Sequence, residues 1–188
     1  MLSPIGLIRR FGRSETGSVM AETVIVLPIL LWSFLALFVY WDSFRSMNTV
    51  QKAAYTISDT ISREMITLPS SYFDGLRNVM DFMIDSDQDV RMRITSFTYN
   101  KTELKYKVMW SYSPNNAMPE LTTAQLVNLE YRLPNMADAD YATILETEVD
   151  YKPAFRVFMD DLTLQQFIVT RPRFVSPTCM NGRTCNAT

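Results

Sequence analysis

Two residues near the start of the chain have types and a spacing that suggest chemistry. They are Gly17 and Glu22, in the stretch RSETGSVMAETVIVLPILLWSF at residues 13–34. Cleavage after Gly17 would make Ser18 the first residue and place its new ammonium group about one helical turn from the Glu22 carboxylate. When chains stack, the amine of one can neutralise the carboxylate of another. The alternative is that Glu22 lies among lipid headgroups, and the residues alone leave both interpretations open.

An uncharged run directly follows this pair, and it is long enough to cross a membrane. Residues 23–41 (TVIVLPILLWSFLALFVYW) carry no charged side chain, and a helix needs about 20 such residues to span the hydrocarbon core. Tyr40 and Trp41 close the run with side chains that suit a membrane interface. Pro28 removes one backbone donor and clashes with the preceding turn. We therefore predict a transmembrane helix over residues 18–41 with a kink at Pro28.

The charges around this run predict its orientation. Three basic residues precede it, namely Arg9, Arg10 and Arg13. By the positive-inside rule, residues 1–17 form a cytoplasmic leader and the chain from residue 42 onward is exported. A secretory signal peptide would have a shorter apolar region followed by small residues at its cleavage site, unlike this run. A plain signal anchor fits the hydropathy but leaves Gly17 and Glu22 without a role.

The exported part begins with a helical pattern and continues with alternating patterns. Over residues 42–69 apolar side chains recur every three or four positions, which predicts an amphipathic helix continuing from the membrane and ended by Pro69; these side chains are Phe44, Met47, Val50, Ala54, Ile57, Ile61 and Met65. Residues 70–188 are predicted to form an α+β domain, with helices at 70–84 and 121–132 and strands at 89–99, 103–112, 141–155 and 164–175. The fold class is therefore α+β, with a long N-terminal helix packed on a mainly antiparallel sheet.

Composition argues against several function classes. The chain has no histidine, which removes the commonest general base, and it has no Gly-rich nucleotide-binding motif. A net charge of −2 without a basic cluster offers no surface for nucleic acid. Cys179 and Cys185 are the only two cysteines; an oxidising compartment favours a disulfide between them, and the rival is a metal site, which normally needs four ligands. We expect no catalytic residues, no cofactor and no bound metal.

The stretch GSVMAETVIVLPILLW at residues 17–32 resembles the N-terminus of type IV pilin-like proteins, specifically the TadE/TadF-like minor pilins of the Tad (Flp) pilus system. The strand ETEVDYKPAF at 146–155 and the segment VTRPRFV at 169–175 resemble later strands of the same family. The resemblance thus covers both ends of the chain, whereas residues 66–140 match in pattern only.

This resemblance implies a pilin-like fold and a pseudopilin that takes part in pilus assembly. It implies a single-pass protein of the bacterial inner membrane, with its C-terminal domain in the periplasm, that a prepilin peptidase cuts after Gly17. Its partners would be membrane lipid, other pilins and the Tad assembly proteins. Many type IV pilins have phenylalanine at mature position one, where this chain has Ser18, so cleavage is implied more firmly than methylation of the amine. The alternative is an uncleaved single-span protein with a periplasmic binding or adhesion domain.

Overall fold

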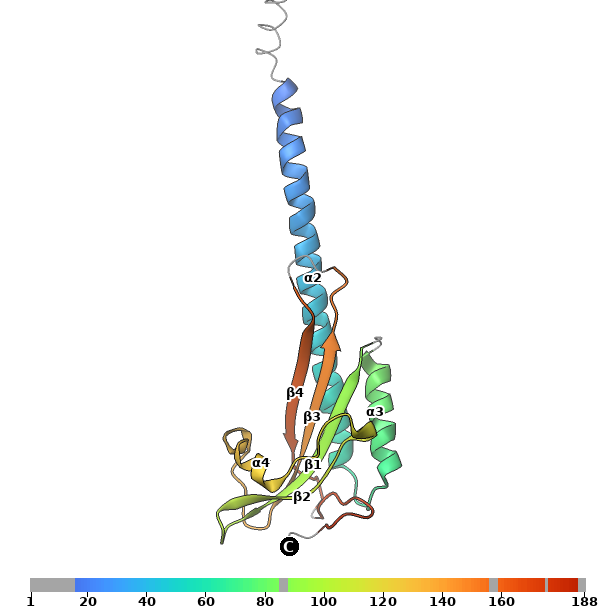
Figure 1. The fold of residues 1–188 in the computed structure, drawn as a ribbon, viewed down its shortest axis with the longest axis vertical. Coiled ribbons are helices and arrows are strands. Elements are labelled where there is room, and N and C mark those ends of the chain that lie inside the picture. Colours follow the sequence, from blue (N-terminus) through green and yellow to red (C-terminus); the bar gives the residue numbers. More distant parts are fainter. Residues whose placement is uncertain (1–15, 85–87, 156–158, 175, 186–188) are drawn as a thin grey trace, which may run out of the picture.

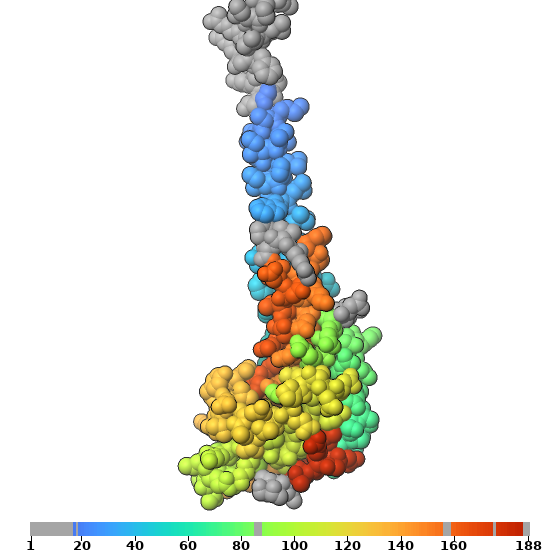
Figure 2. All heavy atoms as spheres, viewed as in Figure 1, coloured from blue at the N-terminus to red at the C-terminus, as the bar shows by residue number. Residues whose placement is uncertain are grey.

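The structure is a computed structural model that describes residues 16–84, 88–155, 159–174 and 176–185. Its longest element is helix α2 (Thr16–Ser62), whose N-terminal half extends alone from the rest of the molecule and whose C-terminal half lies against a sheet (Figure 1). The space-filling view shows the same division, with the blue N-terminal half of α2 standing clear of the broader domain below it (Figure 2). We use "the domain" for the described residues from 42 onward.

Helix α2 is continuous because its sequence offers few breaks. It has no glycine after Gly17, and several of its hydroxyl groups donate to carbonyls of the preceding turn. Thr23 and Ser43 each donate a hydrogen bond to the carbonyl four residues earlier, at 2.8 Å in both cases. Such internal bonds matter most at Thr23, because a hydroxyl group in lipid would find no water to bind.

Four antiparallel strands form the sheet of the domain, in the order β2-β1-β3-β4. They are β1 (Val90–Asn100), β2 (Lys105–Tyr112), β3 (Tyr141–Tyr151) and β4 (Leu162–Thr170). Helix α3 (Ser70–Ile84) lies beside α2 on one face (Figure 1). The predicted α+β fold class is confirmed. The two strands predicted at 89–99 and 103–112 pair as a hairpin in which Asn100 lies opposite Lys105.

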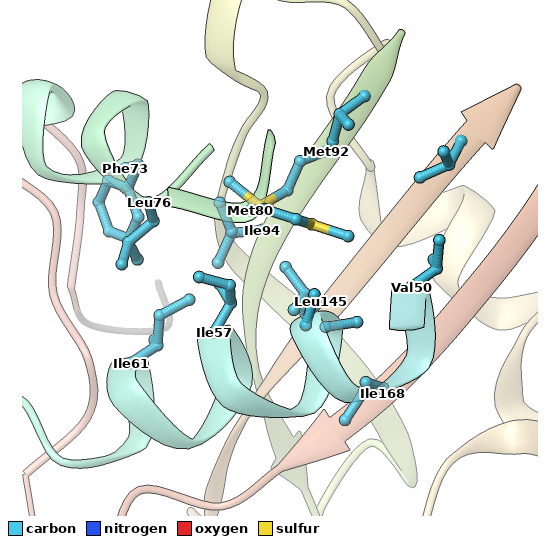
Figure 3. Packing of buried hydrophobic residues seen from close by; sticks show 14 of the residues in the cluster. Val50, Ile57, Ile61, Phe73, Leu76, Met80, Met92, Ile94, Leu145 and Ile168 are labelled. Carbon is cyan, nitrogen blue, oxygen red and sulfur yellow. The ribbon is translucent and has the colours of Figure 1, made fainter. Parts of the chain in front are cut away.

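The larger core lies between the two helices and this face of the sheet. Ile57 and Ile61 of α2 meet Phe73 and Met80 of α3 above Ile94 of β1 (Figure 3). All five side chains are buried, and such close contact is what large apolar side chains need to gain stability from leaving water. The predicted amphipathic face is thus confirmed over residues 50–61. It is wrong at its ends, because Phe44, Met47 and Met65 are exposed.

A β-bulge divides the apolar side chains of β2 between the two faces of the sheet. Strict alternation predicts Val108 and Trp110 on one face. The register instead shifts between Ser96 and Phe97, so that Trp110 pairs with Ser96 while Val108 pairs with Phe97. One extra residue reverses the side on which every following side chain points. Trp110 therefore joins the larger core, and Val108 lies with Phe97 in a second core on the opposite face.

The segment between β2 and β3 covers this second core. It contains the short helices η1 (Pro114–Asn116), α4 (Thr123–Val127) and η2 (Glu130–Arg132), and Leu126 of α4 is fully buried. Thr122 and Gln125 form a reciprocal capping box at the start of α4. The predicted helix over 121–132 is therefore broken into two shorter pieces.

Ion pairs occupy the rest of this face of the sheet, beside the second core. Arg93 of β1 is buried; it pairs with Glu146 of β3 at 2.7 Å and donates to the Pro119 carbonyl of the covering segment at 2.6 Å. Arg91, further along β1, contacts Glu148 at 3.4 Å and Asp150 at 2.9 Å. Cross-strand pairs of opposite charge stabilise this polar part of the sheet.

The C-terminal segment explains why α2 ends earlier than expected. The helix was predicted to run to Pro69, but it ends at Ser62. Leu68 is buried and takes up an extended pairing with the C-terminal segment, donating to the Cys179 carbonyl and accepting from the Asn181 amide, both at 2.9 Å. A residue that pairs in this way cannot also belong to a helix, because its backbone groups are already used.

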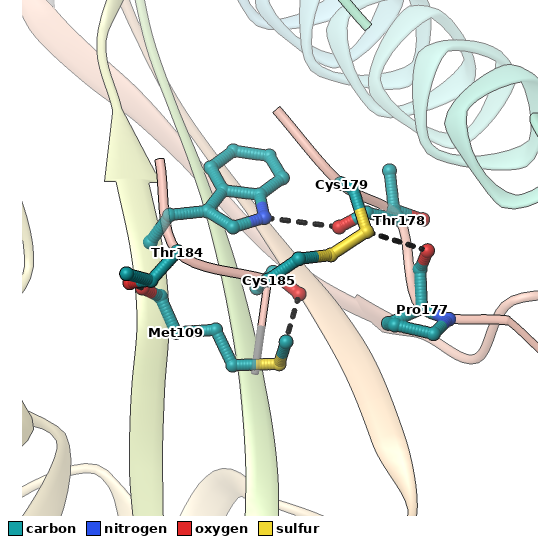
Figure 4. The surroundings of a disulfide bond; sticks show 8 residues. Met109, Pro177, Thr178, Cys179, Thr184 and Cys185 are labelled. Carbon is teal, nitrogen blue, oxygen red and sulfur yellow. Dashed lines mark hydrogen bonds between the residues drawn. A yellow bond between two sulfur atoms is a disulfide. The ribbon is translucent and has the colours of Figure 1, made fainter. Parts of the chain in front are cut away.

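A disulfide between Cys179 and Cys185 closes this C-terminal segment (Figure 4). The indole of Trp110 donates to the Thr178 carbonyl at 2.9 Å, and Met180 is buried in the larger core. Closing so short a loop is expected to contribute about 2 kcal/mol in the chain-entropy model. The predicted disulfide is confirmed, and the hydrogen bond from Trp110 fastens the segment that it closes to β2.

We expect Ile57→Ala to lower the free energy of unfolding by about 2–5 kcal/mol, because it leaves a cavity between α2 and the sheet. Urea unfolding of the full-length protein in detergent, followed by tryptophan fluorescence, measures this change. Tyr55→Ala is the matched control, since Tyr55 lies two residues away on the same helix and is 55% exposed. Equal effects of the two changes would contradict the assigned core.

Candidate functional site

The N-terminal half of α2 is a candidate membrane-spanning helix that the rest of the described chain does not cover. Only 6% of its most apolar 18-residue window is buried. Side chains on all its sides are exposed, among them Val24, Leu30, Phe34 and Leu37. A helix that is apolar all round needs lipid or other helices around it, since water would solvate it poorly. The exposed apolar surface of this half of α2 is therefore the first part of the candidate site.

The predicted cleavage site lies in the first turn of this helix. Gly17 and Ser18 both have helical backbone, whereas residues 1–15 of the predicted leader lie outside the described residues. A Cβ atom added at Gly17 would meet no other atom within 4 Å. The described residues therefore leave room for a side chain at position 17.

Glu22 lies one turn further along, at the head of an apolar stripe on α2. A groove of about 520 Å³ runs beside it, lined by Val19, Glu22, Thr23, Val26, Leu27, Leu30 and Leu31. Within the part of the chain that the structure describes, no hydrogen bond or ion pair engages the Glu22 carboxylate. The structure thus places Gly17, Ser18 and Glu22 close together on one helix, and no counter-charge from the described residues pairs with the carboxylate.

Pro28 lies inside α2, and the helix continues without interruption on both sides of it. Proline lacks an amide hydrogen, so the Val24 carbonyl loses its usual helical partner. A membrane helix tolerates this loss when a neighbouring group supplies another donor. The kink at Pro28 stays a prediction.

A polar contact that the sequence pattern did not predict lies where α2 enters the domain. The Tyr151 hydroxyl donates to the Asp42 carboxylate at 2.6 Å, and Ser43 contacts both the Tyr151 hydroxyl, at 3.3 Å, and the Met159 sulfur, at 3.1 Å. We call these four residues the junction. Asp42 is the first charged residue after the apolar run, which was a signal for a boundary, but nothing in the sequence pairs it with a residue of β3.

The environment of the junction changes the acidity of its tyrosine. Burial raises the pKa of the Tyr151 hydroxyl above its ordinary value of 10.0, and the hydrogen bond to Asp42 raises it further. The neutral hydroxyl is therefore retained as the donor to Asp42. At the opposite end of the domain, burial and the hydrogen bond to Asp74 raise the pKa of Tyr112 in the same way.

Neither a metal centre nor a relative guides the assignment of function. Among the described residues, no three or more His, Cys, Asp or Glu side chains are grouped so that they could hold a metal ion. No protein-family model, curated protein or solved structure matches the chain. Function has to be argued from the exposed helix, the lone carboxylate and the junction.

We expect Tyr151→Phe to lower the free energy of unfolding by about 1.5–3 kcal/mol at neutral pH, because Asp42 loses a hydrogen bond. The wild-type contribution should be complete below pH 10 and should fall as the pH rises through the raised pKa of Tyr151, since the unfolded chain releases this proton first. Urea unfolding at a series of pH values measures both effects. Tyr131→Phe, at an exposed tyrosine, is the control, and an equal pH dependence in wild type and Tyr151→Phe would contradict the junction's role.

Proposed function

We propose that the protein is a minor pilin, or pseudopilin, of the TadE/TadF-like kind that takes part in assembly of a Tad (Flp) type IV pilus. The observation that carries the proposal is the unpartnered Glu22 carboxylate at the head of an apolar helix left uncovered by the described chain. In a stacked assembly the carboxylate can pair with the amine of a neighbouring subunit and help to select its register, a role that a position among lipid headgroups would not give it.

Processing is the first step of the proposed function. The basic leader holds the N-terminus in the cytoplasm, and a prepilin peptidase hydrolyses the peptide bond between Gly17 and Ser18. Hydrolysis adds one water, leaving a carboxylate on Gly17 and an ammonium group on Ser18. The absence of a side chain at Gly17 suits close approach of a peptidase to the backbone, and the fold of this chain does not otherwise demand it.

Assembly is the second step, and it depends on charge. A carboxylate at the centre of a membrane helix costs about 2.5–3.5 kcal/mol on insertion scales, and less near the interface. The Ser18 ammonium group of one subunit neutralises Glu22 of the next. The apolar stripe beside Glu22 then packs against neighbouring helices in place of lipid. The energy of this pair is large enough to select one stacking register among several.

The domain contributes specificity for partners in the periplasm, where oxidising conditions suit the Cys179–Cys185 disulfide. An uncleaved anchor with a periplasmic binding or adhesion domain is the competing function. That alternative requires an intact leader and gives Glu22 no task, so the state of the N-terminus separates the two.

We expect Gly17→Leu to block processing, because the added side chain obstructs the peptidase. Intact mass and N-terminal sequencing of protein from native membranes should show wild type beginning at Ser18 and the variant retaining residues 1–17. Gly75→Leu is the matched control, since a Cβ at Gly75 in α3 also meets nothing within 4 Å. Wild-type protein that begins at its original N-terminus would refute the pseudopilin proposal and favour the uncleaved anchor.

We expect Glu22→Ala and Glu22→Gln to be inserted and cleaved normally but to give about tenfold fewer pili, as for the loss of about 1.4 kcal/mol at one contact. Counting pili by electron microscopy, with immunoblots for cleavage, measures the two steps separately. Asp81→Ala removes a carboxylate from α3 instead and should leave pilus number unchanged. Normal piliation in both Glu22 variants would remove the charge-pairing role.

A further inference from the structure

We infer that the described part of the connection between β3 and β4 (residues 152–155 and 159–161) carries a second membrane-contacting surface, centred on Phe155, that lies in the lipid interface beside α2. The partner is the headgroup and upper acyl region of the bilayer. This surface goes beyond the proposed function, because a cleaved pilin and an uncleaved anchor would both have it.

The height of this connection relative to the apolar run is the first observation. The ring of Phe155 meets the ring of Phe38 edge-on, with centroids 6.4 Å apart. Val39, the next residue of α2, is only 1% exposed, and Met159 contacts Ser43 one turn below it. The domain therefore overlaps the last turn of the uncharged run, as the ribbon also shows where β3 and β4 lead up beside α2 (Figure 1).

The position of the bilayer along α2 is the second observation. Residues 23–41 extend about 28 Å at 1.5 Å per residue, close to the thickness of about 30 Å of the hydrocarbon core. Moving the bilayer one turn toward the N-terminus would bury the Glu22 carboxylate in the hydrocarbon core. The same movement would place Trp41 in water, and because the Trp41 side chain is 59% exposed, its apolar ring would then contact water. Both changes are unfavourable, so the end of the run, together with Phe38, belongs at the membrane surface.

The side chains at this height change from apolar to polar over a short distance, as an interfacial surface requires. Phe155 is 47% exposed and Trp41 lies on the same level of α2, while the guanidinium of Arg45 lies 5.8 Å from the Trp41 ring. The hydrogen bond between Asp42 and Tyr151 lies on the domain side of these aromatic rings. Aromatic rings at the acyl boundary with polar groups just beyond them match the two layers of a bilayer interface.

Two points of contact constrain the domain more than one does. A domain held by α2 alone can tilt and rotate with that helix. With Phe155 also in the interface, the sheet is held at one orientation to the membrane, which keeps the C-terminal segment and the β1–β2 hairpin at the end of the domain away from the apolar half of α2 (Figure 1). The partner-binding surfaces of the domain are then presented in a fixed direction before any assembly begins.

Fluorescence quenching in lipid tests this inference on the full-length chain. Single cysteines replace Leu30, Phe155 or Tyr131, and each is labelled with bimane while the native Cys179–Cys185 disulfide stays intact. The proteins are reconstituted into vesicles of phosphatidylethanolamine and phosphatidylglycerol that contain either a nitroxide lipid labelled near the headgroup or one labelled deep in the acyl chain. Leu30 is the control within the span, and Tyr131 of η2, which is 82% exposed, is the control on the domain surface.

We expect the headgroup nitroxide to quench bimane at Phe155→Cys and the acyl-chain nitroxide to quench bimane at Leu30→Cys, and neither lipid to quench bimane at Tyr131→Cys. Quenching at residue 30 without quenching at residue 155 would overturn the inference and leave the membrane helix in place. No quenching at residue 30 would overturn it as well, since the helix would then not lie in lipid. Equal quenching at residues 131 and 155 would mean that the whole domain lies on the membrane, which overturns the specific surface at Phe155. N-terminal sequencing of the same samples reports on cleavage independently.

Discussion

Helix α2 must satisfy two different environments along one axis, and the rest of the structure depends on how it does so. An α-helix bonds its own backbone, so it can pass from lipid to a protein core without a break. Its N-terminal half is apolar on every side and stays uncovered, while its C-terminal half turns Val50, Ile57 and Ile61 toward the sheet. Without that second half, one face of the sheet would lose its cover.

The two faces of the sheet differ in polarity, because only one of them packs against α2. The face toward α2 is mainly apolar, with buried threonines such as Thr143 and Thr147 among its side chains, whereas the opposite face is apolar only around the second core. Beside that core the same face carries the ion pairs of Arg91 and Arg93 with β3. The bulge beside Phe97 makes the division workable, because it supplies β2 side chains to both cores from one strand.

Local patterns predicted the elements well, and long-range pairing accounts for the failures. The alternation in β1 and the helical period of α3 correspond to the structure closely. The end of α2 was wrong because Leu68 pairs with a segment more than a hundred residues away. The alternation in β2 was misleading for a similar reason, since an extra residue within the strand is set by its partner. The lone carboxylate could be predicted from the sequence, whereas the contact between Asp42 and Tyr151 could not.

The sequence by itself determined the uncharged run, the spacing of Gly17 and Glu22, the two cysteines and the order of helices and strands. These are local properties, because charge, hydropathy and periodicity are carried by neighbouring residues. Only the tertiary structure decided which side of α2 meets the sheet. It also decided how far toward the N-terminal half of α2 the residues that follow β3 extend. Phe38 and Phe155 are far apart in the chain, and they meet only because the hairpin of β3 and β4 runs back along the helix. Contacts of this kind depend on the register of a whole sheet, which no short stretch of sequence encodes.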